Sequence, residues 1–281
     1  MKTLPKKITC GVPQGSCISP TLFILFFSDV VNKITANLKT ALFADDLCIW
    51  TTDKNLKIIE IRLQKAIDEI IKFCNTNELV INKLKTVHTT FTSAGLRGNY
   101  RTKYQLNVKI GDEKIPLDPH PCFLGIKLDP KLDFKEHLSM LKNKIAIKMK
   151  LIKRVKSLKI TNAVRLCLTI YKSCIRSLID YCFVISHVGN GTLIKELQKV
   201  QNASLRCIKF FPFKTSIVKM HSDLKIGRIE PRLHNLLVKY VDRQDNSSLI
   251  RIEWNYYKES LNITDANSQK TKLPFDFLDS Q

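Results

Sequence analysis

The sequence predicts an α+β protein, in which a segment of short antiparallel strands and helices is followed by a helical segment. Residues 38–52, LKTALFADDLCIWTT, place two apolar runs around a tight acidic turn, which is typical of a β-hairpin. Residues 55–77 then carry apolar side chains at helical spacing, with charged residues between them. Beyond Pro130 the apolar pattern becomes helical. These three observations predict a small sheet backed by helices and, after it, helices alone.

The stretch at residues 11–27, GVPQGSCISPTLFILFF, begins with a polar turn and continues into nearly unbroken apolar sequence. We expect a helix that begins at Ser19 or Pro20, because serine caps helices and proline is tolerated at the first helical position. The apolar part, residues 22–31, is interrupted by polar residues, and the chain contains no run of about eighteen apolar residues. No transmembrane helix is therefore predicted.

Further short strands and one loop are predicted before Pro130, from apolar runs separated by polar and glycine-containing segments. In chain order they are strands at residues 79–82 and 87–93, a loop at residues 93–103, a hairpin within residues 104–117 that turns at Gly111–Asp112, and a strand at residues 122–129.

The first helix of the second segment is predicted to begin near Asp133, which can cap it together with Glu136. Further helices are predicted at residues 162–186 and 192–210. One apolar stripe of the first helix consists of Leu138, Leu141, Ile145, Met149, Ile152 and Val155. The opposite face carries the basic residues Lys142, Lys144, Lys148, Lys153 and Arg154.

The composition limits the class of protein. At 281 residues, of which 44% are hydrophobic, the chain is long enough for one large or two medium domains. Its nine cysteines include no CxxC pair, which argues against a zinc site or a disulfide framework. The start MKTLPKKITC lacks the apolar core of a signal peptide, so an intracellular protein is predicted. The polar tail from about Ser260 is predicted to be poorly ordered.

Positive charge is the strongest feature of the composition, with 46 Lys and Arg against 25 Asp and Glu and a net charge of +21. Between Lys131 and Lys214 there are 18 basic and four acidic residues. A basic surface of this strength favours a polyanionic partner, most often nucleic acid. A solvated lysine-rich face, such as AT-rich genomes often encode, is the alternative.

The adjacent carboxylates Asp45 and Asp46 lie at the predicted hairpin tip. Aspartate is a common turn residue, so a solvated turn is one interpretation. However, two neighbouring carboxylates repel each other unless a cation compensates them. Two-metal phosphoryl transfer uses such a pair, because Mg²⁺ takes hard oxygen ligands and shares its remaining positions with substrate phosphates.

The order of several short motifs resembles that of reverse transcriptases of non-LTR retrotransposons, with jockey-like elements of animals as the most similar arrangement. GVPQGSCISPTLF precedes FADD by the length of a helix, and the resemblance extends over roughly residues 9–240. Of the later motifs, FCNTNELVINKLKT resembles a segment ending in Asn-x-x-Lys-Thr, and FLGIKLD resembles a primer-grip strand. LDFKEHL resembles the entry to the thumb, and LQKVQNASLRCI together with HSDLKI resembles a post-thumb segment.

The resemblance implies a partial reverse-transcriptase palm, a small antiparallel sheet with helices, followed by a helical thumb. Residues 1–130 would be the C-terminal half of the palm, including the primer-grip-like region. Residues 131–214 would be the basic helical thumb, and residues 215–281 a post-thumb segment with a disordered tail. The implied partners are an RNA template, a DNA primer and a deoxynucleoside triphosphate, with no membrane.

The resemblance also implies the roles of single residues. Asp45 would bind the catalytic Mg²⁺ ions, or Mn²⁺ in their place, and Asp46 would assist. Phe43 would pack under the primer terminus, and Ala44 would be small enough to admit the nucleotide. Lys85 would lie near the phosphates as a proton donor to pyrophosphate, or be a surface lysine in a polar turn.

The remaining implied contacts surround the nucleic acid. The polar turn of Gly11, Pro13, Gln14, Gly15 and Ser16 would lie under the incoming nucleotide and the template base, with glycine where a side chain would collide with the nucleotide. Leu124 and Gly125 would hold the primer end, or be ordinary strand residues. The basic helix face of Lys142, Lys144, Lys148, Lys153 and Arg154 would follow the template–primer backbone.

The sequence departs from the family pattern before the polar turn. A palm polymerase needs a third carboxylate on a strand that precedes this turn, and the ten residues before Gly11 contain no acidic residue. The fingers and the first half of the palm are also not found in this chain. We therefore expect an N-terminally truncated fragment that does not synthesise DNA by itself.

Three interpretations remain open. The chain is a truncated reverse transcriptase, a non-catalytic nucleic-acid-binding protein that relies on the basic thumb, or a subunit completed by a separate palm and fingers segment. The retained Asp45–Asp46 pair favours the first, because these carboxylates repel nucleic acid when no metal is bound. Since the family acts on nuclear DNA, a nuclear location is one expectation. An incomplete palm should also expose a sheet edge and an apolar face, and so limit solubility.

Overall fold

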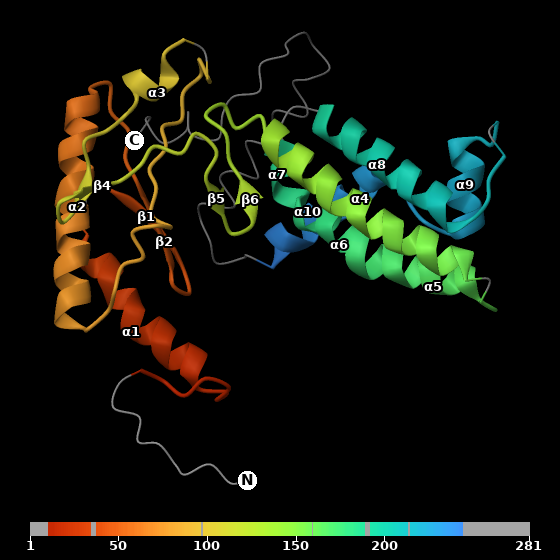
Figure 1. Ribbon diagram of the computed structural model, residues 1–281, viewed down its shortest axis with the longest axis horizontal. Helices are drawn as coiled ribbons and strands as arrows, with labels where there is room; N and C mark the ends of the chain where they lie inside the picture. Colours follow the sequence, from red (N-terminus) through yellow and green to blue (C-terminus); the bar gives the residue numbers. More distant parts are fainter. Residues whose placement is uncertain are drawn as a thin grey trace. The chain divides into compact units, whose positions relative to one another are not determined.

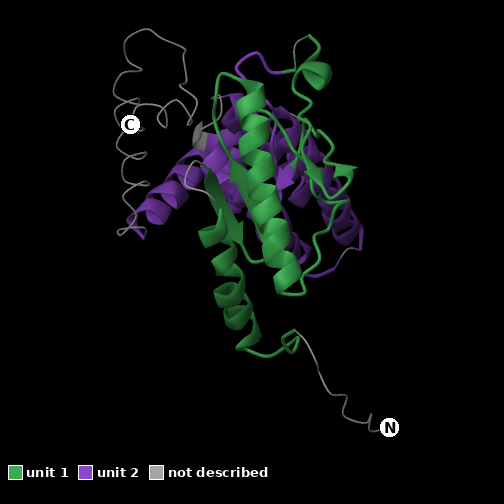
Figure 2. Ribbon diagram, turned by 90° about the vertical axis from the view of Figure 1, so that its left-hand side faces the viewer, with its two compact units in different colours: residues 1–90, 96–121 green, residues 91–95, 122–281 purple. Residues whose placement is uncertain are grey.

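The structure is a computed structural model that describes residues 11–34, 38–96, 98–158, 160–188, 192–212 and 214–243. The chain divides into two compact units, which are coloured separately in Figure 2. Unit 1 contains residues 1–90 and 96–121, and unit 2 contains residues 91–95 and 122–281. In the described residues, unit 1 combines helices with two short hairpins, and the regular elements of unit 2 are helices and one hairpin (Figure 1). The α+β class predicted from the sequence is confirmed.

Unit 1 begins with helix α1 and the predicted hairpin. Helix α1 spans Ser19–Lys33, and strands β1 (Lys39–Phe43) and β2 (Asp46–Trp50) pair antiparallel. The helix begins where it was predicted, but Ser19 does not cap it. Its hydroxyl instead donates to the carbonyl oxygen of Pro13 at 2.6 Å and so fastens the preceding polar turn to the helix.

Helix α2 (Leu56–Thr76) joins the two hydrophobic clusters of unit 1. Asn55 caps it by accepting a hydrogen bond from the backbone N–H of Lys57 at 2.9 Å. One face of α2 packs through Phe73 and Cys74 against α1 and the β1–β2 hairpin. The other face packs against the hairpin of β3 (Lys109–Ile110) and β4 (Glu113–Lys114). Each large apolar side chain buried in these clusters stabilises the unit by about 1.5–3 kcal/mol.

Two strand predictions in unit 1 are wrong. Residues 79–82 form no strand, and in the segment 87–93 only His88 makes an isolated bridge, with Leu117. The short apolar runs lack a partner strand and are followed or preceded by turns, so their β propensity is not realised. The predicted loop at residues 93–103 contains the short helix α3 (Tyr100–Lys103). The hairpin predicted at Gly111–Asp112 is confirmed.

Unit 2 begins with a hairpin where a single strand was predicted. Strands β5 (Cys122–Phe123) and β6 (Ile126–Lys127) pair antiparallel around a two-residue turn, Leu124–Gly125. The prediction of one continuous strand is wrong because Leu124 adopts the left-handed conformation, at φ 47°, next to Gly125 at φ 76°. Leucine gives no signal for such a turn.

Helix α4 spans Lys135–Ser157, and its predicted cap is also wrong. The residue before the helix is Phe134, in the left-handed conformation at φ 56°, and Asp133 does not cap it. The buried carboxylate of Asp129 instead accepts the backbone N–H groups of Lys131, Asp133 and Phe134 at 3.2, 3.0 and 2.6 Å. This carboxylate therefore fixes the loop between β6 and α4.

The helix predicted at residues 162–186 is a series of four consecutive segments. They are α5 (Ala163–Ile170), the π-helical segment η1 (Tyr171–Arg176), α6 (Ser177–Tyr181) and α7 (Phe183–Val188). Helices α8 (Thr192–Ile208), α9 (Ile217–Leu224) and α10 (Ile229–Asp242) follow in the described part of the unit. The helix predicted at residues 192–210 thus corresponds to α8.

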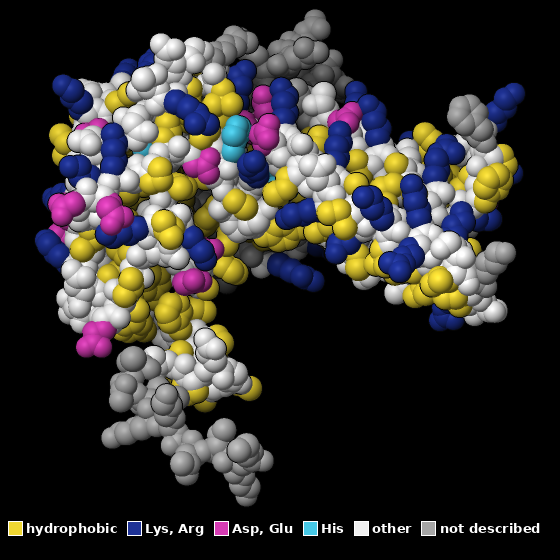
Figure 3. Space-filling view, in the orientation of Figure 1, with side chains coloured by type: hydrophobic (Ala, Val, Ile, Leu, Met, Phe, Trp, Pro, Cys, Tyr) yellow, Lys and Arg dark blue, Asp and Glu magenta, His cyan; other side chains and the backbone are white. Residues whose placement is uncertain are grey.

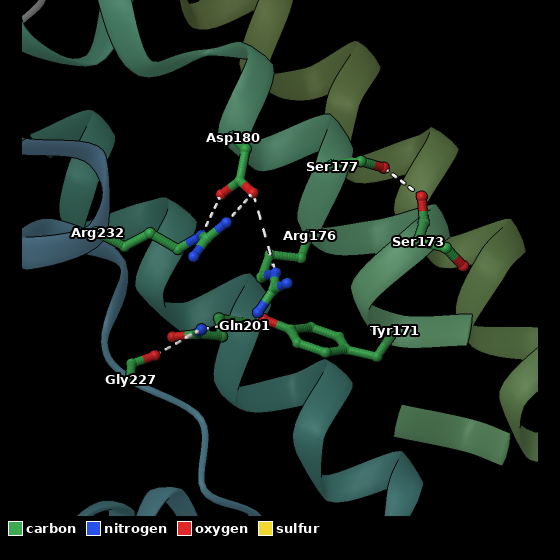
Figure 4. A network of polar contacts seen from close by, with 8 residues as sticks. All are labelled: Tyr171, Ser173, Arg176, Ser177, Asp180, Gln201, Gly227 and Arg232. Atoms are coloured by element: carbon green, nitrogen blue, oxygen red, sulfur yellow. Dashed lines mark hydrogen bonds and ion pairs between the residues drawn. The ribbon is translucent and has the colours of Figure 1, made fainter. Parts of the chain in front are cut away.

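A large hydrophobic core and a polar network hold unit 2 together. Fully buried residues of the core include Ile152 on α4, Ile175 on η1, and Leu197 and Leu205 on α8. Figure 4 shows the network, in which Asp180 accepts hydrogen bonds from Nε and Nη2 of Arg232 at 2.7 and 2.6 Å. Arg176 lies 3.9 Å from the same carboxylate.

The network continues into the core. Gln201 donates to the hydroxyl of Tyr171 at 3.0 Å and to the carbonyl of Gly227 at 3.1 Å (Figure 4). These bonds satisfy both N–H groups of the Gln201 amide, and its Oε1 accepts from Nε2 of Gln198 at 2.8 Å, so this fully buried side chain connects η1, α8 and the loop before α10.

The eight cysteines among the described residues are all free thiols. In the described part of the chain, no helix combines the length and the apolar character that crossing a bilayer requires. The polar tail from about Ser260 lies outside the described residues.

Candidate functional site

The acidic pair occupies the tip of the β1–β2 hairpin in unit 1. Phe43 pairs with Asp46 at the end of the ladder, which leaves Ala44 and Asp45 as the two-residue turn. Ala44 has φ 52°, a left-handed conformation that is unfavourable for a residue with a Cβ atom. All four residues from Phe43 to Asp46 are exposed. The turn thus presents both carboxylates to solvent.

Neither carboxylate is paired with a cation in the described part of the chain. Asp45 and Asp46 have no hydrogen-bond or ion-pair partner among the described residues, although the chain carries a large excess of positive charge. No group of three or more potential metal ligands occurs in the described part of the chain. The pair therefore offers hard oxygen ligands, but it supplies only part of a metal coordination shell.

The polar turn before α1 owes its shape to glycine. Gly11 and Gly15 have φ 81° and 90°, and a Cβ atom on either would meet no other atom within 4 Å. The backbone conformation, rather than any contact within this chain, therefore requires glycine here. The backbone N–H of Ser16 closes the turn on the carbonyl of Pro13 at 3.3 Å. Gln14 is exposed beside them.

The position of this turn depends on α1, which packs against β1 and α2. The ring of Phe27 lies 6.3 Å from that of Phe73 on α2, measured between ring centroids. The elements that carry the polar turn and the acidic pair therefore share one hydrophobic cluster, which also contains Val30, Leu42 and Leu47.

Lys85 lies in a turn that follows α2 in unit 1. Its backbone N–H donates to the carbonyl of Asn82 at 3.1 Å, and its side chain is exposed. Among the described residues the ammonium group has no acidic partner. The structure shows no contact between Lys85 and the acidic pair, so its role near phosphates stays a prediction.

Leu124 and Gly125 form the turn between β5 and β6 in unit 2, and Gly125 is exposed. The hydroxyl of Tyr181, at the end of α6, donates to the carbonyl oxygen of Leu124 at 2.6 Å. Tyr181 was not identified from the sequence as part of the site. No local pattern could have shown it, because the hydrogen bond joins residues 57 positions apart.

The predicted basic face of α4 is two separate stripes. Lys142 and Lys153 are eleven residues apart, close to three helical turns, and lie on one side of the helix. Lys144 and Lys148, one turn apart, lie on another side, and Arg154 lies between the stripes. The prediction of a single face is therefore too simple.

Lys142 is the exception among these cations because it has an acidic partner. Its ammonium donates to Glu196 on α8 at 2.7 Å, and Lys199 donates to the same carboxylate at 2.6 Å. The hydrogen bonds from Lys142 and Lys199 lower the pKa of Glu196 to about 2. Lys144, Lys148, Lys153 and Arg154 have no acidic partner in the described ranges and are exposed.

The surface around the free lysines combines cations and apolar groups. Ile147 and Leu151 are exposed on α4 between them, and Lys150 lies one turn before Arg154. Figure 3 shows dark blue Lys and Arg side chains along the helices of unit 2, with hydrophobic side chains between them. The four-residue spacing of Lys150 and Arg154 in the sequence places both on one side of the helix, so Lys150 could have been predicted as part of the basic surface.

Residues 2–128 match the family described as reverse transcriptase (RNA-dependent DNA polymerase). The matched range contains the polar turn, the acidic pair, Lys85 and the Leu124–Gly125 turn, whereas α4 lies outside it. The match covers the site that geometry and charge single out in unit 1.

Relatives from Drosophila transposons match most of the chain. The RNA-directed DNA polymerase from mobile element jockey of Drosophila melanogaster is 25% identical over 248 residues, which is 86% of this chain and 26% of the relative. The probable RNA-directed DNA polymerases from transposon BS and transposon X-element, of the same species, are each 24% identical over 249 and 243 residues, or 86% and 84% of this chain.

The chain spans about a quarter of the length of these curated relatives, with 26–27% of each covered. No solved structure matches the chain. The family match and the relatives confirm the resemblance to reverse transcriptases of non-LTR retrotransposons that the motifs indicated.

Proposed function

We propose that this chain is the part of a retrotransposon RNA-directed DNA polymerase that supplies two metal-binding carboxylates and a basic nucleic-acid surface. The exposed pair Asp45–Asp46 carries the proposal, because it lies at a hairpin tip, has no partner among the described residues and falls within the residues matched to the reverse transcriptase family. Two uncompensated carboxylates at one turn fit a site whose cations arrive with the substrate.

The donor set of this turn fits Mg²⁺. Carboxylate oxygens are the protein ligands that this ion prefers, and it commonly keeps waters and phosphate oxygens in its remaining positions. Asp45 would hold the metal, with Asp46 assisting from the start of β2. When bound, paired metal ions activate the attacking oxygen and stabilise the leaving oxygen in phosphoryl transfer. Mn²⁺ has similar ligand preferences and would serve in its place.

The neighbouring residues would shape the space around the nucleotide. The left-handed Ala44 offers only a methyl group at the tip, and the side chain of Phe43 is exposed beside it, where it can pack against the primer end. Gln14 and the turn closed by Ser16 would face the template base and the nucleotide. Lys85 would be the proton donor to pyrophosphate.

Unit 2 would bind the template and primer. Cations on α4 that include Lys144, Lys148 and Lys153 lack an acidic partner among the residues the structure describes, and such cations bind phosphates with salt-dependent affinity and little sequence preference. Lys142, in contrast, is engaged by Glu196 and would contribute little. The Leu124–Gly125 turn would contact the primer end.

We propose that the 281-residue chain alone does not extend a primer. The acidic pair is not joined by a third carboxylate in the described ranges, so a two-ion site would lack a bridging ligand. A complementary segment with fingers and the first half of the palm would supply that ligand and the cradle for the triphosphate.

Primer extension tests this function. The chain, its Asp45→Ala variant and a fusion of the chain to an upstream palm-and-fingers segment are compared on oligo(dT) annealed to poly(rA), with Mg²⁺. We expect extension by the fusion only, and its loss when Asp45 is replaced in the fusion. If the chain alone extends the primer and Asp45→Ala abolishes this activity, the site does not need a third carboxylate from a complementary segment.

A non-catalytic nucleic-acid-binding protein is the second candidate. The observation that favours it is that the free cations belong to α4 in unit 2, whereas the acidic pair belongs to unit 1. If neither the chain nor the fusion extends a primer, a gel shift on the same substrate at increasing salt would distinguish this function from the absence of binding.

A further inference from the structure

The turn between β5 and β6 has a conformation that its sequence does not favour. Leu124 and Gly125 have φ 47° and 76°, and they connect the paired residues Phe123 and Ile126. Two consecutive positive φ angles in a two-residue hairpin define a type I′ turn, for which Asn-Gly is the preferred pair. Glycine suits the second position, but leucine at the first costs about 1–2 kcal/mol.

Tyr181 compensates for this cost from another element of unit 2. Its hydroxyl donates to the carbonyl oxygen of Leu124 at 2.6 Å, so the bond holds the peptide group between the two turn residues. Its ring also lies against the turn, since a Cβ atom on Gly125 would be 3.8 Å from Cε1 of Tyr181. The Tyr181 residue is 56% exposed, so the hydroxyl contributes little to the core itself.

A second contact fastens the strand that leaves the turn. The backbone N–H of Lys127 donates to Nδ1 of His137 at 3.2 Å. Nδ1 is therefore unprotonated, which places the proton on Nε2, 3.3 Å from Sγ of Cys182. The thiol in turn donates to the carbonyl of Leu178 at 3.4 Å. This chain of hydrogen bonds connects β6, α4 and α6. It does not include the turn residues Leu124 and Gly125, whereas the hydroxyl of Tyr181 binds the carbonyl of Leu124.

We propose that Tyr181 is a positioning residue that holds the Leu124–Gly125 turn in its left-handed conformation. The role of this turn in primer binding rests on the proposed function, whereas the positioning by Tyr181 does not. Tyr181 acts through the Leu124 carbonyl and is not itself required to touch nucleic acid.

The first test compares two tyrosine-to-phenylalanine variants of the full chain by amide hydrogen exchange. Tyr181→Phe removes only the hydroxyl that holds the turn, and we expect ~3–10-fold faster exchange at Ile126, which closes the hairpin. Tyr171→Phe is the matched control, because its hydroxyl accepts from Gln201 in the core and does not contact the hairpin. The control should leave exchange at Ile126 unchanged while it lowers the melting temperature.

The second test is a rescue. Leu124→Asn puts at the first turn position the residue that a type I′ turn prefers. If Tyr181 offsets the unfavourable conformation of Leu124, this change should restore slow exchange at Ile126 in the Tyr181→Phe background. A merely structural role of Tyr181 in α6 would not respond to a substitution in the turn.

The outcomes separate the two proposals. Unchanged exchange at Ile126 in Tyr181→Phe, or equal acceleration in Tyr171→Phe, overturns the positioning role. Faster exchange that Leu124→Asn reverses supports it. Affinity for oligo(dT) annealed to poly(rA) is then measured on the same variants. A loss confined to Tyr181→Phe supports both proposals, whereas unchanged affinity supports positioning and removes the turn from primer binding.

Discussion

Among the described residues, His137 is buried and His88 is half-buried, and both accept backbone N–H groups. Leu106 donates to Nε2 of His88, and Lys127 donates to Nδ1 of His137, each at 3.2 Å. Burial lowers the pKa of both imidazoles, with a further contribution from Lys144 at His137. Each ring is therefore held neutral in the folded chain at pH values where it would be charged after unfolding.

This difference predicts that acid destabilises the fold. As the pH falls through about 6.5, the unfolded chain takes up protons on these histidines while the folded chain does not, so the free energy of unfolding decreases until the lowered pKa values are reached. Urea midpoints at about pH 5 and about pH 7.5 measure it. His137→Gln should reduce the difference between the two urea midpoints. An unchanged difference would show that His137, the histidine in unit 2, does not cause the loss of stability in acid.

The ion pair of Asp180 and Arg232 gives a second prediction for a single residue. Asp180→Asn keeps the shape of the side chain but removes the charge from two short hydrogen bonds and leaves Arg232 without a counterion. We expect a loss of about 1–3 kcal/mol in the free energy of unfolding. Glu230→Gln on α10, which is exposed, is the control. Equal stability of both variants would show that the pair is solvated.

Among the elements, helix α4 provides a test of nucleic-acid binding. Replacing Lys144 and Lys148 with alanine should weaken binding and reduce the slope of log affinity against log salt by about one per lysine that contacts a phosphate. Lys142→Ala should change the slope less, because Glu196 already engages that ammonium. Titrations of a labelled duplex at several salt concentrations measure the slopes, and equal slopes in all variants would exclude α4 from the interface.

The elements with strong periodicity or turn chemistry were predictable from the sequence. The hairpin around Asp45 and Asp46, helix α2 and helix α8 lie where apolar spacing placed them. The β5–β6 turn was not predictable, because leucine is disfavoured at φ 47° and the compensating bond comes from Tyr181. The prediction of the α4 cap was wrong for a similar reason, since the backbone N–H of Phe134 donates to the buried carboxylate of Asp129, five residues earlier.

The candidate site was predictable in its residues but only partly in its environment. Motif order pointed to the acidic pair and the polar turn, and both lie in unit 1 within the range matched to the family. Charge alone could not show that Lys142 is paired while Lys144 and Lys148 are free, because that difference depends on Glu196 from α8. Contacts between distant segments carry this information, and local spacing does not.

At the scale of the whole molecule, unit 1 exposes a large apolar surface. On and before α1, Ile18, Leu22 and Leu25 are 63%, 49% and 64% exposed and recur at helical spacing on one side. Figure 3 shows hydrophobic side chains gathered in this region of unit 1. The two-stranded sheet of β1 and β2 also leaves strand edges unpaired in the described residues.

This surface predicts self-association of the isolated chain. We expect sedimentation to show oligomers or aggregates at about tens of micromolar, because exposed apolar patches of this kind associate. The double substitution Leu22→Gln and Leu25→Gln should shift the chain toward monomer without loss of stability, since both side chains are exposed. A parent chain that is monodisperse and melts cooperatively would refute the expectation.

The π-helical segment η1 has a consequence for the comparison of related chains. A π turn contains one more residue than an α turn, so η1 arises formally by the insertion of one residue into a helix. The wider π turn absorbs this extra residue, whereas an α-helical path through the same residues would rotate α6 by about 100° and carry Asp180 away from Arg232. A relative with an uninterrupted α-helix here would therefore align with a one-residue gap inside the helix, and positions after the gap would keep their inward and outward roles.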